Sequence, residues 1–424
     1  MSQNRPVVVL VDAYTSGKYL PPEFTALGAD LVHVQSTPEF MPSMPAPDLS
    51  VYRAALVHED LEGTLLRLKE YAPVCVLAGQ EPGVLLADQL AEGLGLPANG
   101  PALSEARRDK YLMGEALRVA GLHCADQLKS RDTDTLVRWA ERTGRFPAVV
   151  KPLNSAAGDG VFICADAEEV RTAADGILDT ETIYGDTNTE VLVQSYLQGT
   201  EYVVDMVSYE GRRHVCGVWE YEKRLLPSGR NIYDRDRLLA ADEGPAPELI
   251  AYVEEALDAL GVRFGPTHAE VILTPQGPAL VEVGTRIAGN MHPAFHSAVA
   301  GGNQAALTAL AYLDPARFLA DHAGRRYGKL REAVCHTTST TQSGTVESID
   351  EGAVAELSAL ETVDRFDLKI GPGGTVRPTV DLYSSTLRIF MSGASMAEID
   401  RDCRRIDEIK DRIYRFRETS AGAK

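Results

Sequence analysis

The chain has 424 residues, of which 44% are hydrophobic and 24% are charged, and its formal net charge at pH 7 is -19. This length exceeds one ordinary hydrophobic core, so two to four domains or subdomains are expected. The negative charge argues against nucleic-acid or anionic-membrane partners, because no general positive field attracts phosphates. An anionic substrate must therefore be bound by a few local cations or by a metal ion.

The sequence also carries signals about cellular location. The N-terminal apolar run "VVVLV" is too short for a signal peptide, and no later segment approaches a membrane span. The six cysteines are scattered without a CxxC pair, so we expect neither disulfides nor a zinc site. These features together favour the cytoplasm.

The first hundred residues predict a small Rossmann-like α/β domain. "PVVVLVDAYTSGKYLPPEFTALGADLVHV" reads as strand, polar loop, helix and strand, and the proline-rich residues 36–50 read as an irregular connection. "APVCVLAG" predicts another buried parallel strand, followed by the helical "EPGVLLADQLAEGLG". Neither GxGxxG nor GxxxxGK[ST] occurs, so the motifs of dinucleotide-binding and P-loop domains are missing.

The next segment predicts an α+β lobe. "YLMGEALRVAGL" has helical spacing of apolar residues, and "FPAVVKP" leads into the small-residue loop "LNSAAGDG" before "GVFICA" and a further helix. The loop has two interpretations. By itself it is typical of a hairpin turn, and in a nucleotide-binding protein it would be a flexible lid over phosphates.

The second half of the chain predicts antiparallel strands and two further regions. Residues 191–224 alternate in the manner of strands around an "EG" turn, and "APELIAYVEEALDALG" predicts a helix. A second hairpin, "HAEVILTPQGPALVEVGTR", follows. From about Tyr327 the pattern is a mixture of strands and helices that indicates a separate C-terminal domain.

Two glutamates of this second hairpin give the strongest chemical signal. Glu270 and Glu282 are each six residues from Gln276 in the turn sequence "TPQGP". A turn centred there places the two side chains opposite one another, with Cβ atoms roughly 4.5–5.5 Å apart. Facing carboxylates are destabilising unless a cation neutralises them, and carboxylate oxygens are typical ligands of magnesium. The alternative is a shifted register that leaves one glutamate exposed.

Two other residues belong to the same region. Strand alternation places His268 on the face of Glu270, where it is either a site residue or a structural hydrogen-bonding partner. Arg286 follows directly after the second strand.

The order of these motifs resembles the ATP-grasp superfamily of carboxylate–amine ligases, over roughly residues 100–310. The motifs are a lysine, a glycine-rich loop, "QSYLQGTEY", and paired glutamates that end in "EVGTR". Within the superfamily, "AYTSGKYLPPEF" and "RRDKYLMGEAL" are similar to segments of bacterial L-amino acid ligases, which make dipeptides. The resemblance implies a Rossmann-like N-terminal domain (1–104), an ATP-grasp fold of two α+β lobes that clasp ATP (105–188 and 189–326), and a C-terminal α+β domain (327–424).

The resemblance also implies an ATP site. Lys110 and Lys151 would bind phosphate oxygens and the adenine edge, Gln194 and Leu197 would form the adenine hinge, and Glu201 would bind the ribose. The full set of residues implied to bind ATP is Lys110, Lys151, Ser155, Ala156, Gly158, Gly160, Gln194, Tyr196, Leu197, Glu201 and His268.

The metal and catalytic residues follow from the same resemblance. Glu270 and Glu282 would hold two Mg²⁺ ions, with Mn²⁺ as a substitute, although many superfamily members have a third ligand, asparagine, where this chain has Gly284. Arg286 would stabilise the acyl phosphate and Lys223 would reach the γ-phosphate. Three further residues are candidates for binding substrate: Glu81, Glu220 and His292.

These features predict an ATP-dependent ligase. It would form an amide between an amino acid or related carboxylate and an amino acid amine through an acyl phosphate, in dipeptide or peptide-like natural-product biosynthesis. One alternative is a purine-biosynthesis-type or biotin-carboxylase-like enzyme of the superfamily, and another is a non-catalytic ATP-binding regulatory protein. The expected partners are small molecules, with the superfamily's usual homodimer as the expected assembly.

Overall fold

The computed structural model describes residues 5–41, 44–144, 146–155, 158–225, 231–382 and 384–417. The chain forms two compact units, one of Met1–Val218 with Ala240–Gly328 and the other of Trp219–Leu239 with Lys329–Lys424. The predicted division into four domains stays a prediction. Among the described residues, no helix combines the length and the apolar character that a membrane span requires.

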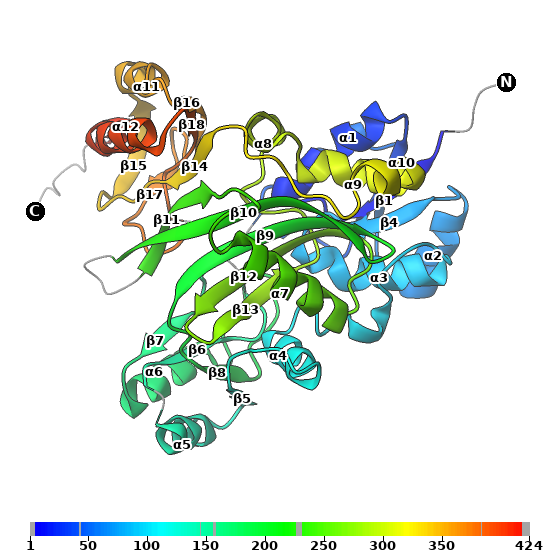
Figure 1. Cartoon of the computed structure of the whole chain (residues 1–424), viewed down its shortest axis with the longest axis horizontal. Coiled ribbons are helices and arrows are strands. Elements are labelled where there is room, and N and C mark those ends of the chain that lie inside the picture. Colours follow the sequence, from blue (N-terminus) through cyan, green and yellow to red (C-terminus); the bar gives the residue numbers. More distant parts are fainter. Residues whose placement is uncertain are drawn as a thin grey trace, which may run out of the picture. The chain divides into compact units, whose positions relative to one another are not determined.

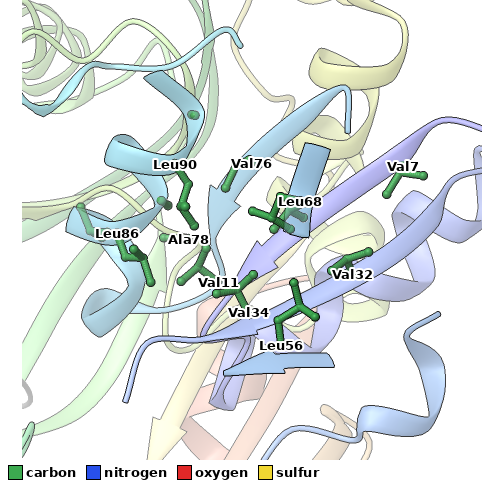
Figure 2. Packing of buried hydrophobic residues seen from close by; sticks show 14 residues of the cluster. Val7, Val11, Val32, Val34, Leu56, Leu68, Val76, Ala78, Leu86 and Leu90 are labelled. Atoms are coloured by element: carbon green, nitrogen blue, oxygen red, sulfur yellow. The ribbon is translucent and has the colours of Figure 1, made fainter. Parts of the chain in front are cut away.

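The first unit begins with a parallel sheet whose strand order is β3-β2-β1-β4. Its strands and main helices are β1 (Val7–Val11), α1 (Leu20–Ala26), β2 (Asp30–Gln35), β3 (Ala54–Val57), α2 (Leu61–Lys69), β4 (Cys75–Ala78) and α3 (Val84–Gly93). Alternate residues of the central strands point to opposite faces of the sheet, and both faces are buried. One face packs against α2 and α3, as Figure 2 shows for Leu68 and Leu90. The other packs against α1 and α9 (Gln304–Leu313).

Most of the strands and helices predicted for this sheet domain are present, but the prediction missed β3 and α2. In β3 only Leu56 is buried, since this strand lies at the edge of the sheet. An edge strand with one buried side chain has little of the apolar pattern on which sequence analysis depends.

A second sheet, antiparallel and of order β5-β8-β6-β7, follows within the first unit. Its elements are α4 (Lys110–Val119), β5 (Gln127–Ser130), α5 (Thr133–Thr143), β6 (Ala148–Pro152), β7 (Phe162–Cys164), α6 (Ala167–Ile177) and β8 (Val191–Ser195). Apolar side chains of α5 and α6 pack on this sheet. The segment "LNSAAGDG" connects β6 to β7, and Ala148 pairs with Cys164, so the predicted hairpin is confirmed.

The remaining strands of the first unit have the order β13-β12-β9-β10 (Figure 1, green). The elements are β9 (Thr200–Tyr209), the start of β10 (Arg212–Leu225), α7 (Ala246–Ala259), β12 (Gly265–Thr274), β13 (Gly277–Gly284), α8 (Pro293–Ala300), α9 and α10 (Pro315–Asp321). The hairpin β12–β13 is the one that carries the glutamate pair.

The second unit is built around the strand order β10-β11-β14-β18-β16 and a small sheet of order β17-β15-β19. Besides the end of β10 it contains β11 (Asn231–Leu238), β14 (Glu332–Thr337), β15 (Gly344–Ile349), α11 (Glu351–Ser358), β16 (Val363–Leu368), β17 (Thr375–Val376), β18 (Leu387–Gly393), α12 (Met396–Ile409) and β19 (Tyr414–Phe416). Its core includes Ile389, Ile399 and Ile406, which are all fully buried.

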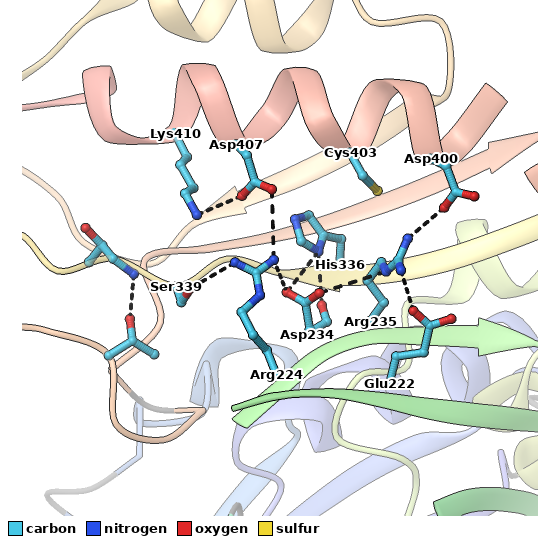
Figure 3. Close-up of polar contacts among 12 residues, drawn as sticks. Glu222, Arg224, Asp234, Arg235, His336, Ser339, Asp400, Cys403, Asp407 and Lys410 are labelled. Carbon is cyan, nitrogen blue, oxygen red and sulfur yellow. Dashed lines mark hydrogen bonds and ion pairs between the residues drawn. The ribbon is translucent and has the colours of Figure 1, made fainter. Parts of the chain in front are cut away.

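Charged side chains link strands β10 and β11 to helix α12 inside the second unit (Figure 3). Arg235 lies 2.5 Å from a carboxylate oxygen of Glu222 and 2.7 Å from one of Asp400. Beside it, Arg224 pairs with Asp234 at 2.8 Å. Because Asp400 is on α12 and Glu222 on β10, one arginine connects two strands to a helix.

Candidate active site

The two glutamates lie opposite one another, as the sequence predicts. Glu270 of β12 pairs directly with Glu282 of β13. The turn contains only Pro275 and Gln276, so its centre lies half a residue before the predicted centre at Gln276. A register shift next to Glu270 compensates for this difference, so Glu270 still pairs with Glu282. Such a β-bulge adds one residue to one strand and redirects its side chains.

Lys110 connects this pair to the β6–β7 hairpin. Its Nζ lies 2.6 Å from Glu282 Oε2 and donates a hydrogen bond of 2.8 Å to the carbonyl oxygen of Ser155. Its backbone N–H donates to the carbonyl of Leu153 at 3.1 Å. One buried lysine therefore contacts both the carboxylate pair and the start of the glycine-containing loop.

Lys151, at the end of β6, is the second buried cation of the site and is only 5% exposed. Burial and the nearby Lys110 lower its pKa to about 8, although Glu282, Glu270 and Glu201 act in the opposite direction. Two buried lysines that repel one another favour a nearby anionic ligand, because an anion would stabilise both charged forms.

The glutamate pair fits a hard cation with few protein ligands. Within the described ranges, no three or more His, Cys, Asp or Glu side chains are grouped as a metal site. Two facing carboxylates beside cations that favour phosphate are nevertheless the donors that Mg²⁺ uses when substrate phosphates and water complete its coordination.

His268 has a buried acidic partner that the sequence analysis missed. Its Nδ1 lies 2.7 Å from Asp205 Oδ1 on β9, and its Nε2 lies 3.8 Å from Glu270 Oε1. Burial by itself would lower the pKa of His268, but Asp205 and Glu270 raise it to about 9. The only signal in the sequence was one aspartate inside the apolar run "YVVDMV".

Glu81 and Arg286 meet at the end of β13. Glu81 follows β4 of the parallel sheet, and its Oε2 lies 3.7 Å from Nε of Arg286. Arg108, which the sequence analysis did not identify, lies 3.9 Å from the other oxygen of Glu81. Burial raises the pKa of Glu81 against the opposing effect of both arginines. These residues line one pocket together with Lys110, Ser155 and Glu282.

Comparison with known proteins decides the family. A model of the ATP-grasp domain matches residues 144–294. Dapdiamide A synthase of Enterobacter agglomerans is 34% identical over 394 residues, which cover 90% of this chain and 90% of that protein. The chain belongs to the ATP-grasp family of ligases. It is an ATP-dependent amide-forming ligase, and the prediction made from its motifs is confirmed.

Solved structures confirm the fold class of this ATP-grasp ligase. An L-amino acid ligase from Bacillus licheniformis matches with a TM-score of 0.76 and 20% identity over 98% of this chain and all of that one. The biotin carboxylase domain of a 2-oxoglutarate carboxylase from Hydrogenobacter thermophilus, crystallised with MgADP, ADP and bicarbonate, matches with a TM-score of 0.64 and 14% identity over 97% of this chain and 90% of that one. The family binds ATP with magnesium.

The other residues that the resemblance implied for ATP lie on strands β8 and β9 or in the loops next to strands. Gln194 is on β8 and donates a hydrogen bond to Gln127 at 3.0 Å. Tyr196 is 41% exposed and Leu197 is partly buried just after β8, and Glu201 lies at the start of β9. Gly158 and Gly160 have positive φ angles of 78° and 67°. Ala156 lies outside the described residues.

Three substrate or phosphate candidates have local partners. His292 accepts a hydrogen bond from the backbone of Phe295 and so caps α8. Glu220 and Lys223 belong to the second unit, where Glu220 pairs with Arg237 at 2.9 Å and Lys223 lies 4.6 Å from the centre of the Tyr233 ring. Their roles toward substrate stay predictions.

Proposed function

We propose that this ATP-grasp ligase joins the carboxylate of an amino acid or related acid to the amine of a second amino acid. The observation that carries the proposal is the convergence of Lys110, Arg286 and Glu282, which pairs with Glu270 across the hairpin, around one pocket. The names of two relatives, dapdiamide A synthase and L-amino acid ligase, support amino acid substrates and a role in making dipeptides or peptide-like natural products.

The reaction begins with transfer of the γ-phosphoryl group. A carboxylate oxygen of the acid attacks the γ-phosphorus of ATP, the bond to ADP breaks, and an acyl phosphate forms. Lys110 and Lys151 would neutralise the phosphate oxygens as charge-assisted donors. Glu270 and Glu282 would hold two Mg²⁺ ions, or Mn²⁺, which supply further neutralisation of the triphosphate.

Amide formation follows in the same pocket. The neutral amine attacks the acyl carbon, phosphate leaves with the electrons of the C–O bond, and the nitrogen loses one proton and keeps the other as the amide N–H. Arg286 would stabilise negative charge on the acyl oxygen and on the departing phosphate. The hairpin that carries Ser155, Gly158 and Gly160 would close over the phosphates and keep water from the acyl phosphate.

The remaining assignments are part of the same proposal. Gln194, Tyr196 and Leu197 would contact adenine, Glu201 would contact the ribose, and His268 would also contact ATP. Lys223 would reach the γ-phosphate, and Glu81, Glu220 and His292 would contact substrate. We keep a homodimer in the cytoplasm as the expected state of the enzyme.

A phosphate-release screen tests the proposed function. The enzyme is incubated with ATP, Mg²⁺ and pairwise mixtures of amino acids, and products are identified by mass. Phosphate release that requires two amino-acid-like substrates supports the proposal. Release driven by bicarbonate or by a phosphoribosyl amine would indicate a purine-type or biotin-carboxylase-like enzyme instead. ATP binding without turnover would indicate a regulatory protein.

A further inference from the structure

Arg108 lines the pocket but has no role in the reaction described above. It lies two residues before Lys110, directly ahead of α4, and its side chain is 17% exposed. Its pocket neighbours include Glu81, Glu282 and Arg286. A charged group this well buried in an active-site pocket requires a partner.

Glu81 lies between two arginines without a close hydrogen bond to either Nε. The distances are 3.9 Å to Nε of Arg108 and 3.7 Å to Nε of Arg286, and N–H···O hydrogen bonds span about 2.7–3.2 Å. Among the residues that the structure describes, neither Nε–H donates a hydrogen bond, although both are buried. Because buried donors of a cation favour an anionic acceptor, these two groups point to a ligand that brings carboxylate or phosphate oxygens.

Gly284 has no side chain, and this makes room for Glu81 beside Arg286. A Cβ atom at position 284 would lie 3.0 Å from Oε2 of Glu81 and 3.1 Å from the guanidinium carbon of Arg286. Even alanine would press against both groups. Glycine at this position therefore leaves room for the observed approach of Glu81 to Arg286, and a larger residue would require both side chains to shift.

The order of charges in the pocket is complementary to an α-amino acid. Arg108, Glu81 and Arg286 present a cation, an anion and a second cation in turn. In the proposed function, on which this inference rests, Arg286 is used by the acyl phosphate. The attacking amine must lie between the acyl carbon and its own carboxylate. Glu81 lies between the two arginines, so its carboxylate is placed to contact this amine. The carboxylate of the amine donor is then left for Arg108.

We propose that Arg108 binds the free carboxylate of the amine-donating amino acid and selects α-amino acids over amines that have no carboxylate. The ring of Tyr184, whose centre is 6.0 Å from the guanidinium carbon, helps to orient Arg108. Lys110, which contacts Glu282 and the Ser155 carbonyl, lines the same pocket.

The test separates activation of the acid from capture by the amine. Four proteins receive ATP, Mg²⁺ and the twenty common L-amino acids: the wild type, Arg108→Met, Arg108→Lys and Arg118→Met. The last is the control, because Arg118 is an exposed arginine of α4. One series adds hydroxylamine, which intercepts an acyl phosphate as a hydroxamate and has no carboxylate. Another adds the α-carboxamides of the same amino acids as competing amine donors. Dipeptides, dipeptide amides and hydroxamates are quantified by mass.

The expected result is a change in the ratio of products. Arg108→Met lowers dipeptide formation at least about tenfold more than it lowers hydroxamate formation, which is the size of effect expected for one charge-assisted contact. It also shifts the remaining products from dipeptides toward dipeptide amides. Arg108→Lys restores part of the preference, and Arg118→Met behaves as the wild type. Equal loss of dipeptide and hydroxamate in Arg108→Met would overturn the inference. No hydroxamate and no dipeptide from the wild type would instead contradict the proposed function.

Discussion

At the scale of single residues, the site depends on a balance between buried charges of opposite sign. Glu282 faces Glu270 across the hairpin, and Lys110 contacts Glu282 at 2.6 Å. The same carboxylate helps to keep Lys151 charged, against the effect of burial. Glu282 is therefore the side chain at which the proposed metal site and the phosphate-binding lysines meet.

Replacing Glu282 by glutamine tests this position. Glu282→Gln keeps the shape of the side chain but removes a proposed metal ligand, so we expect turnover to fall at least about 100-fold, as the loss of several kcal/mol of charge stabilisation implies. The magnesium dependence of ATP turnover should move to higher concentration, while far-UV circular dichroism stays nearly unchanged. The control is Glu255→Gln, an exposed glutamate of α7. A normal rate in Glu282→Gln would show that the metal assignment is wrong.

At the scale of elements, two features have a testable mechanical role: the hairpin β6–β7 and the ion pairs of Arg235 that link β10 and β11 to α12. Gly160 has a φ of 67°, and a Cβ atom there would lie 2.8 Å from a side-chain atom of Pro152. Any other residue at this position is strained by its backbone and by this contact. The loop therefore depends on glycine for its observed path.

Changing Gly160 to alanine should impair closure of the hairpin. Strain in the hairpin raises KM for ATP several-fold, and water then reaches the acyl phosphate, so more phosphate is released than amide is formed. The ratio of phosphate to product in one assay measures both effects. The control is Gly176→Ala in α6, where the added methyl group meets no atom within 4 Å apart from its chain neighbours and the backbone of its own helix. An unchanged ratio in Gly160→Ala would argue against a lid.

Arg235 should stabilise the second unit because it lies between Glu222 and Asp400 (Figure 3). Arg235→Leu leaves two carboxylates close together without their cation, and we expect a loss of about 1–2 kcal/mol in the free energy of unfolding, after allowance for partial exposure. Urea unfolding followed by the fluorescence of Trp219 in a Trp139→Phe background measures it. The exposed Arg405→Leu on α12 should cost less than about 0.5 kcal/mol. Equal losses of unfolding free energy in both variants would contradict a specific stabilising role of the Arg235 ion pairs.

The sequence predicted elements and their chemistry better than it predicted which side chains meet. The facing glutamates followed from a turn and strand alternation, and they pair as expected even though the real turn is tighter, because a bulge compensates. Asp205 and Arg108 could not be identified, since the first meets its partner through strand pairing and the second through packing between Glu81 and the start of α4. Contacts between elements distant in sequence leave no local pattern.

At the scale of the whole molecule, two buried histidines should make stability sensitive to acid. Burial lowers the pKa of His33 and of His296 from 6.5 to about 4. His33 is 1% exposed and accepts a hydrogen bond from the backbone N–H of Ala13, which requires the neutral ring. Below pH 6.5 the unfolded chain binds protons that the folded chain does not, so stability is fully present above that pH and is lost as pH falls toward 4.

His33→Gln isolates one of these contributions. Glutamine accepts the same hydrogen bond but does not titrate, so the unfolding free energy of the wild type should fall relative to the variant by up to about 1.4 kcal/mol per pH unit between pH 6.5 and 4. Urea unfolding at several pH values provides the measurement. Parallel pH profiles for the two proteins would contradict a buried neutral His33.

The proposed reaction depends on an acyl phosphate formed from the acid substrate. The direct measurement is the fate of oxygen in an acid substrate whose carboxylate carries two ¹⁸O atoms, after turnover with ATP, Mg²⁺ and an amino acid amine. Attack on the γ-phosphorus transfers one carboxylate oxygen, so inorganic phosphate should contain one ¹⁸O atom and the amide carbonyl the other. Unlabelled phosphate would contradict the mechanism proposed for this ATP-grasp ligase. The label would then be found either entirely in the acid or with one ¹⁸O atom in AMP.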